Sequence, residues 1–219
     1  MSERVPVAVV GIGGLFPKAP TLDAYWDNIR GRLCAAADVP AERWLLGQDD
    51  AFQAEPRPAP DKVYSTKACL VSGFELDAAG FLLPESLLKG LDPVFHFALH
   101  AGRQAWKDAA TEGLDKRRVG VILGNIALPT DRFSAHSRRM LARELSAVLG
   151  RPLDEPPAAH PYDRSPAGLP GAVLARALGL GGGSYTLDAA CASSLYAVKL
   201  AVGDVVHAGL FVLLGHLDD

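Results

Sequence analysis

Cysteine is scarce in this chain, and long hydrophobic runs are absent. The sequence has 3 cysteines in 219 residues, Cys34, Cys69 and Cys191, which are too few and too scattered for a disulfide framework or a metal-ligand cluster. No segment reaches the run of about 18 apolar residues that a membrane span needs, and the first apolar run is too short for a signal-peptide core. These absences predict a cytoplasmic protein with no membrane partner.

Positive charge is not in excess either. The formal net charge is −3, so the chain has no overall basic field of the kind that attracts nucleic acid. Hydrophobic residues make up 49% of the sequence, which is enough for a sizeable core. We therefore predict a globular chain, organised as one domain over residues 1–219, with no nucleic-acid partner.

Apolar runs and turn residues predict strands that alternate with helices. The expected strands are residues 5–10, 118–124, 184–187 and 210–214. The expected helices lie between Thr21 and Gly31, from Asp92 toward Gly113, and over residues 134–149, 172–178 and 192–202. Residues 48–62 and the proline-rich residues 152–170 are expected to be loops. This order indicates an α/β protein with a layered, mostly parallel sheet.

Cys191 stands in a run of small residues between an expected strand and an apolar helix. The thiolate is the reactive form of cysteine, and the N–H groups and dipole at a helix start favour negative charge. Small neighbours would let a long acyl thioester approach. The helix is apolar on nearly every face except at Lys199, so we expect a core helix with Cys191 at the inner end of a pocket. The alternative is a small buried residue at a tight turn, and Cys34 and Cys69 are expected to be packing or surface thiols.

Residues 188–195, DAACASSL, resemble the active-site motif of the β-ketoacyl synthases, the condensing enzymes of fatty-acid and polyketide assembly. Further matches to that family follow in order: VAVVGIGGLFP at 7–17, YWDNI at 25–29, FELDAAGF at 74–81, LDP at 91–93 and RVGVILG at 118–124. DKVYS at 61–65 and GNIALPT at 124–130 resemble the synthases of the polyunsaturated-fatty-acid type. The resemblance implies the thiolase-like layered αβαβα fold, with this chain as its N-terminal, nucleophile-bearing half.

The resemblance also implies a reaction. Cys191 would accept an acyl chain from an acyl-carrier protein, and a malonyl-type thioester would lose carbon dioxide and attack that acyl group. No cofactor or metal is expected on this chain, because phosphopantetheine would arrive on the carrier protein. The family forms dimers near the strand that precedes the cysteine, so we expect a homodimer, or an exposed face that a missing C-terminal half should cover.

The two histidines of the family lie in its second half, and neither of their motifs occurs in this sequence. A truncated chain would explain this, and the alternative function is a catalytically incomplete scaffold or carrier-binding fragment. None of the histidines present has the surroundings of those motifs: His96, His100, His136, His160, His207 and His216. His96 and His100 share a helix face, but no third ligand is evident for a metal.

Two other functions have weaker support in the sequence. Gly11 and Gly13 follow an expected strand, as in a dinucleotide-binding turn, but Phe16 stands where the third glycine of that fingerprint is expected. A serine hydrolase is not indicated, because the chain contains no Gly-x-Ser-x-Gly elbow.

Overall fold

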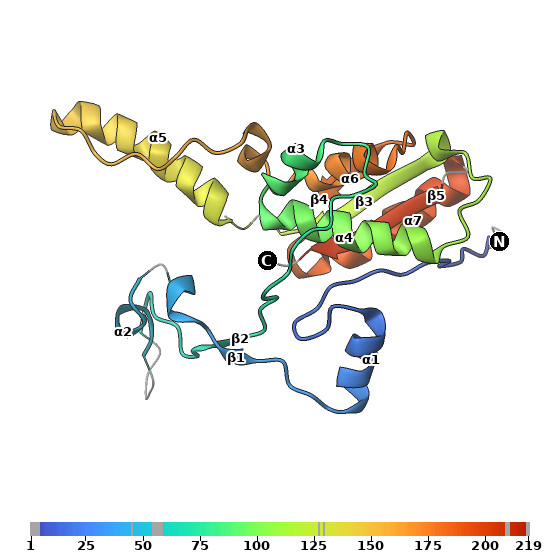
Figure 1. Cartoon of the computed structure of the whole chain (residues 1–219), viewed down its shortest axis with the longest axis horizontal. Helices are drawn as coiled ribbons and strands as arrows, with labels where there is room; N and C mark the ends of the chain where they lie inside the picture. The colour runs from blue at the N-terminus through green and yellow to red at the C-terminus, as the bar shows by residue number, and fades with distance from the viewer. Residues whose placement is uncertain are drawn as a thin grey trace. The chain divides into compact units, whose positions relative to one another are not determined.

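The computed structural model describes residues 5–44, 46–53, 59–126, 128, 130–208 and 211–217 (Figure 1). The chain divides into two compact units: Met1–Gly14 with Glu75–Asp219, and Leu15–Phe74. Within the described ranges, no helix combines the length and the apolar character that crossing a bilayer requires.

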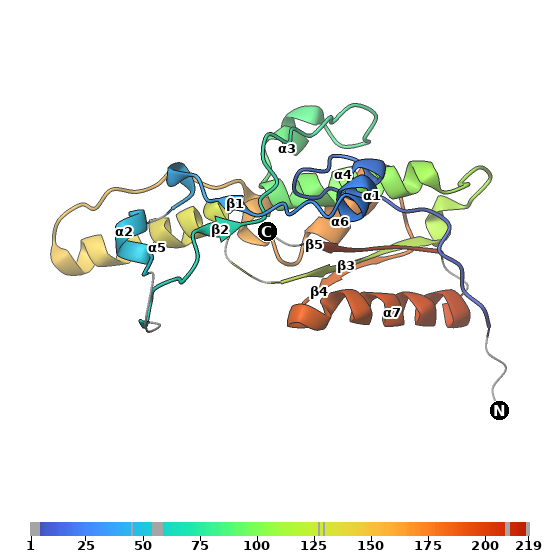
Figure 2. The same cartoon turned by 90° about the horizontal axis from the view of Figure 1, so that it is seen from below.

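A parallel three-stranded sheet is the centre of the larger unit. Its strand order is β4 (Ser184–Leu187), β3 (Val119–Asn125) and β5 (Phe211–Leu217), and β3 pairs in parallel with both neighbours. All 7 residues of β3 are buried, as the continuous apolar run predicted. Helices α4 (Pro93–Asp108) and α6 (Pro170–Leu178) lie on one face, and α7 (Ser193–Ala208) lies on the other (Figure 2). The expected parallel, layered arrangement is confirmed for this unit.

The helix on the first face begins where its sequence predicted. The Asp92 carboxylate accepts a hydrogen bond from the Val94 N–H at 3.2 Å, and Pro93 occupies the first turn, where it loses no helical hydrogen bond. An apolar stripe on α4, which includes Phe95 and Leu99, is buried and faces the core. The helix ends at Asp108, before the expected residue 113.

The remaining helices of this unit are α3 (Glu85–Lys89) and α5 (Asp131–Leu149). α5 starts earlier than expected because Thr130 caps it: the Thr130 hydroxyl accepts from the Phe133 N–H at 3.3 Å. Short 3-10 turns cover Lys116–Arg118, Pro161–Arg164 and Ala190–Ala192. The proline-rich residues 152–170 are otherwise irregular up to the start of α6, as predicted.

α7 is packed on one side only, which differs from the core helix that its composition predicted. Ala197 and Ala201 are buried against Ile122 of β3, with Leu187 and Val212 packed around them. On its other sides α7 exposes large apolar side chains: Leu195, Tyr196, Val198, Leu200, Val202 and Val206. A helix that is apolar all round needs two packing partners, and the described part of the chain provides one.

The strand predicted at residues 5–10 is wrong. These residues are exposed and form no strand, and none of them pairs with an outer edge of the sheet β4-β3-β5. The segment that follows lies along α4, where the Ile12 N–H donates to Asp108 and the Gly14 N–H donates to Gln104, each at 2.9 Å. The contact needs glycine, since a Cβ on Gly13 would lie 2.1 Å from a backbone oxygen of α4.

The smaller unit contains α1 (Leu22–Arg30), α2 (Gln48–Ala51), the 3-10 turn Ala41–Arg43 and the antiparallel pair β1 (Ala37–Asp38) and β2 (Lys67–Ala68). Thr21 caps α1 through the Ala24 N–H, and Gly31 ends the helix, as predicted. α2 lies in the stretch expected to be a loop, of which residues 54–58 are outside the described residues. Phe16 stacks on Tyr25 with ring centroids 3.9 Å apart.

Candidate functional site

Cys191 lies in the tight turn that joins β4 to α7. β4 ends at Leu187, the 3-10 turn Ala190–Ala192 follows, and α7 starts at Ser193. β4 runs parallel to β3 with Leu187 opposite Gly124, so the turn leaves the carboxyl end of the sheet. Ligand sites in open parallel sheets gather at this end. The structure thus places Cys191 directly before a helix start, as the small-residue run predicted.

Side chains hold the backbone of this turn on both sides of Ala190. Ala190 has a φ of 48°, in the left-handed region that residues with a Cβ rarely adopt. Its N–H donates to the Asp188 carboxylate at 2.8 Å, and its carbonyl accepts from the Ser193 hydroxyl at 2.7 Å. The same hydroxyl accepts from the Ala189 N–H at 2.9 Å. The residue before the cysteine is therefore fixed by hydrogen bonds in an unusual conformation.

The thiol side chain is open to solvent. Cys191 is exposed, and Cys34 and Cys69 are also exposed, so exposure does not separate the three. The alternative of a buried structural cysteine is wrong for Cys191. The expectation that it lies at the inner end of a pocket is also wrong for the described residues, because the walls expected from a fully packed α7 are not there.

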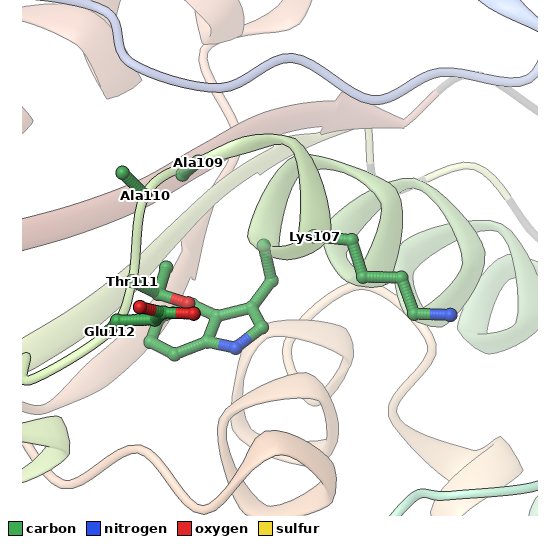
Figure 3. A pocket seen from close by; sticks show the side chains of 6 residues that line it. Lys107, Ala109, Ala110, Thr111 and Glu112 are labelled. Atoms are coloured by element: carbon green, nitrogen blue, oxygen red, sulfur yellow. The ribbon is translucent and has the colours of Figure 1, made fainter.

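An open hollow lies elsewhere, at the C-terminal end of α4 (Figure 3). Its lining residues are Trp106, Lys107, Ala109, Ala110, Thr111 and Glu112. The Lys107 side chain extends away from Thr111 and Glu112 (Figure 3). Lys116 lies over the Trp106 ring, 5.3 Å from its centroid. None of these residues belongs to the Cys191 turn, so the hollow is a separate feature.

The histidines do not form a metal site in the described part of the chain. Three or more His, Cys, Asp or Glu side chains that could hold an ion are not brought together there. On α4, His96 donates to the Leu88 carbonyl at 2.7 Å, while burial and the nearby Arg103 charge lower the pKa of His100. His160 accepts from the Tyr162 N–H, and His207 is exposed. The side chain of His216 lies outside the described residues.

The dinucleotide-binding alternative has no structural support. Gly11 and Gly13 pack against the backbone of α4 at Ala101 and Ala105, in the body of the helix. A phosphate-binding turn presents its N–H groups between a strand end and a helix N-terminus. Neither of those elements is formed by the described residues at this position.

Sequence reasoning missed a buried carboxylate cluster where α4, α5 and the turn Pro161–Arg164 meet. Asp163 is 0% exposed and accepts from the Asp92 N–H at 2.9 Å. Its other oxygen lies 3.3 Å from a guanidinium nitrogen of Arg132, which also donates to the Gly90 carbonyl. Shortly after Asp163 in the chain, the Pro166 carbonyl accepts a hydrogen bond from the Asn125 side chain at the end of β3, at 3.2 Å. A lone aspartate in a proline-rich loop gave no signal of this burial.

Comparison with known proteins connects the turn to one family. A family model, described as the N-terminal domain of β-ketoacyl synthase, matches residues 4–209. Polyketide synthase ThaG of Burkholderia thailandensis is 34% identical over 205 residues, which are 89% of this chain and 3% of that protein. A polyunsaturated fatty acid synthase from Thraustochytrium sp. is 25% identical over 218 residues, which are 92% of this chain and 8% of that protein.

Solved structures give the same result for the fold. The PfaC Keto synthase-Chain length factor structure matches with a TM-score of 0.79 and 31% identity, over 92% of this chain and 23% of that chain. A ketosynthase from module 6 of the bacillaene synthase from Bacillus subtilis 168 matches with a TM-score of 0.62 and 23% identity, over 93% and 30%. The thiolase-like layered fold is confirmed, and the chain spans less than a third of each of these relatives.

Proposed function

The chain belongs to the β-ketoacyl synthase family through the N-terminal domain of that family, and on this basis we propose that it is the nucleophile-bearing half of a ketosynthase. The observation that carries the proposal is the exposed Cys191 in the turn before α7, inside the matched residues. The relatives that make polyketides and polyunsaturated fatty acids support fatty-acid or polyketide biosynthesis as the setting.

The first proposed step is acyl transfer to the cysteine. The Cys191 thiolate attacks the carbonyl carbon of a carrier-bound thioester, a new sulfur–carbon bond forms, and the carrier sulfur leaves and takes up the proton that the cysteine lost. The number of thioesters stays the same, so the step needs no oxidant or external energy source. The small residues Ala189 and Ala192 leave room for the incoming chain, and the exposed thiol gives the thioester access.

The second proposed step is decarboxylative condensation. A malonyl-type thioester loses carbon dioxide, and its carbanion forms a carbon–carbon bond to the acyl carbon while the cysteine thiolate leaves. Both the enolate and the tetrahedral oxyanion need hydrogen-bond donors. We propose that the missing donors come from a second half-domain that covers the outer face of α7. The exposed Leu195 and Tyr196 at the start of that helix, 72% and 51% exposed, support a covering partner beside Cys191.

The proposed partners follow from the same family. An acyl-carrier protein delivers the acyl chain on its own phosphopantetheine arm, so this chain would need no cofactor of its own. A homodimer is proposed along β4, since β4 is an edge of the sheet among the described strands and carries the Cys191 turn at its end. An unpaired strand edge offers N–H and C=O groups to a second copy.

A second candidate function is a scaffold that binds carrier protein without completing the condensation. The one-sided packing of α7 favours it for the chain alone, because an uncovered helix beside Cys191 leaves reaction intermediates open to water. The two candidates differ in whether the protein turns over a malonyl thioester.

Acyl transfer is testable by intact-protein mass spectrometry. The chain is incubated with an acyl pantetheine thioester and with acyl-carrier protein, alongside the Cys191→Ala variant and the Cys34→Ser variant as a matched control. The proposal expects one acyl group on the wild type and on Cys34→Ser, and none on Cys191→Ala. Carbon dioxide release from malonyl-carrier protein is then measured with and without an added C-terminal half of a ketosynthase. The nucleophile-bearing half should release it only with the added half, whereas a scaffold should release none in either case. A wild-type chain that stays unacylated would contradict the ketosynthase proposal.

A further inference from the structure

We propose that Ser193 is a positioning residue for Cys191, a role that rests on the proposed function. Ser193 begins α7, is 0% exposed and does not itself face the solvent where a substrate would approach. Its hydroxyl oxygen lies between two backbone groups, accepting from the Ala189 N–H at 2.9 Å and donating to the Ala190 carbonyl at 2.7 Å. We call this pair of bonds the Ser193 clasp.

The clasp acts on a conformation that would not persist unaided. Ala190 has a φ of 48°, and in this region the Cβ of an L-residue crowds the following backbone. Such a residue remains there when its surroundings determine its geometry at several points. The clasp holds the Ala190 carbonyl and the Ala189 N–H, while the Asp188 carboxylate holds the Ala190 N–H at 2.8 Å. The direction in which Cys191 leaves the turn follows from these dihedral angles.

The two holding residues differ in how firmly they are anchored. Asp188 is exposed, so water competes for its hydrogen bond. Ser193 is buried, and the helix it begins packs on the sheet through Ala197 and Ala201. The clasp therefore ties the nucleophile turn to the rigid body of the unit. A displaced thiol would still react with small reagents, but it would meet a thioester carbonyl at the wrong angle.

The test compares three variants in a Cys34→Ser/Cys69→Ser background of the full chain. Ser193→Ala removes the clasp, and Ser193→Ala with Ala190→Gly removes both the clasp and the Cβ that makes the left-handed conformation costly. Ser194→Ala is the matched control, because Ser194 is the next residue of α7 and both bonds of the clasp belong to Ser193. Circular-dichroism melting curves check that each variant is folded. Acylation of Cys191 by an acyl pantetheine thioester is followed by mass spectrometry over a range of probe concentrations.

Ser193→Ala is expected to lower the saturating acylation rate by about tenfold or more, with the half-saturating concentration unchanged. Adding Ala190→Gly to Ser193→Ala should raise the acylation rate of that variant by about five- to tenfold, because glycine adopts positive φ without steric cost. If Ser193 only stabilised the fold, Ser193→Ala would lower the melting temperature. It would not lower the acylation rate at an unchanged half-saturating concentration, and glycine at position 190 would not restore the rate. The proposal is overturned if folded Ser193→Ala acylates within about twofold of Ser194→Ala.

Failure of the proposed function is read separately. If the wild type takes no acyl group while iodoacetamide labels Cys191, the ketosynthase assignment fails. Amide hydrogen-exchange rates in the turn then test separately whether the Ser193 clasp holds it. Faster exchange of the Ala189 and Ala190 amides in Ser193→Ala than in Ser194→Ala would support it. Equal exchange in the two variants would overturn it.

Discussion

Replacing Asp163 with alanine is expected to lower the free energy of unfolding by about 1.5–4 kcal/mol. The carboxylate is fully buried, and its loss leaves the Asp92 N–H without an acceptor, which costs about 1–3 kcal/mol. The ion pair with Arg132 adds about 0.5–1 kcal/mol, a small value because the Arg132 side chain is 43% exposed and solvent screens it. Arg132→Ala is expected to cost about 1–2 kcal/mol, since it leaves a buried charge with one hydrogen bond fewer.

The assay is urea unfolding of the wild type, the two single variants and the double variant. The double variant should resemble Asp163→Ala, because the hydrogen bond that Arg132 keeps to the Gly90 carbonyl is exposed and contributes little. Hydrogen exchange in α5 should accelerate in all three variants, since Arg132 and Asp163 join the first turn of α5 to the turn Pro161–Arg164. Fully additive effects of the two substitutions, or a loss below about 0.5 kcal/mol for Asp163→Ala, would refute this reasoning.

Three further predictions concern reactivity, pH and the exposed helix face. Iodoacetamide should label Cys191 faster than the other two cysteines, although all three are exposed, and equal labelling would contradict activation by the turn. Burial, with a smaller contribution from the Arg103 charge, holds the pKa of His100 in the folded protein below its ordinary 6.5. As the pH falls through 6.5 the unfolded state therefore binds the proton before the folded state does, and the free energy of unfolding should decrease. The decrease should be less steep in His100→Gln. Val198→Lys on the exposed face of α7 should change the free energy of unfolding by no more than about 0.5 kcal/mol in urea unfolding, whereas Ala197→Leu on the buried face should cost about 1–3 kcal/mol; equal losses for the two would contradict one-sided packing.

Local sequence signals predicted the elements that local chemistry determines. Asp92 with Pro93, and Thr21 with Gly31, set helix ends through bonds within a few residues, and the structure has them at those positions. β3 was predictable because a strand buried on both faces is apolar throughout. The turn of Cys191 was predictable from its small residues and from the family resemblance.

The errors arose where the outcome depends on distant parts of the chain. Residues 5–10 have a strand composition, but a strand also needs a partner, and in the described residues this segment pairs with neither outer edge of the sheet. The buried Asp163 depends on Arg132, 31 residues away, which no periodic pattern reveals. The pocket expected around Cys191 needs walls on both sides of α7, and the described residues build one. The Ser193 clasp could have been predicted from the sequence, because a serine shortly after a tight turn often forms hydrogen bonds to the backbone of that turn.

The attachment of residues 11–14 to α4 also constrains the order in which the protein folds. The two hydrogen bonds of that attachment span 96 and 90 residues of chain. During synthesis residues 11–14 cannot form these bonds until α4 has emerged from the ribosome. Residues 15–74, which form the smaller unit, are synthesised in between. Contacts of such long range are slow to form, so docking of this segment should be a late step in folding.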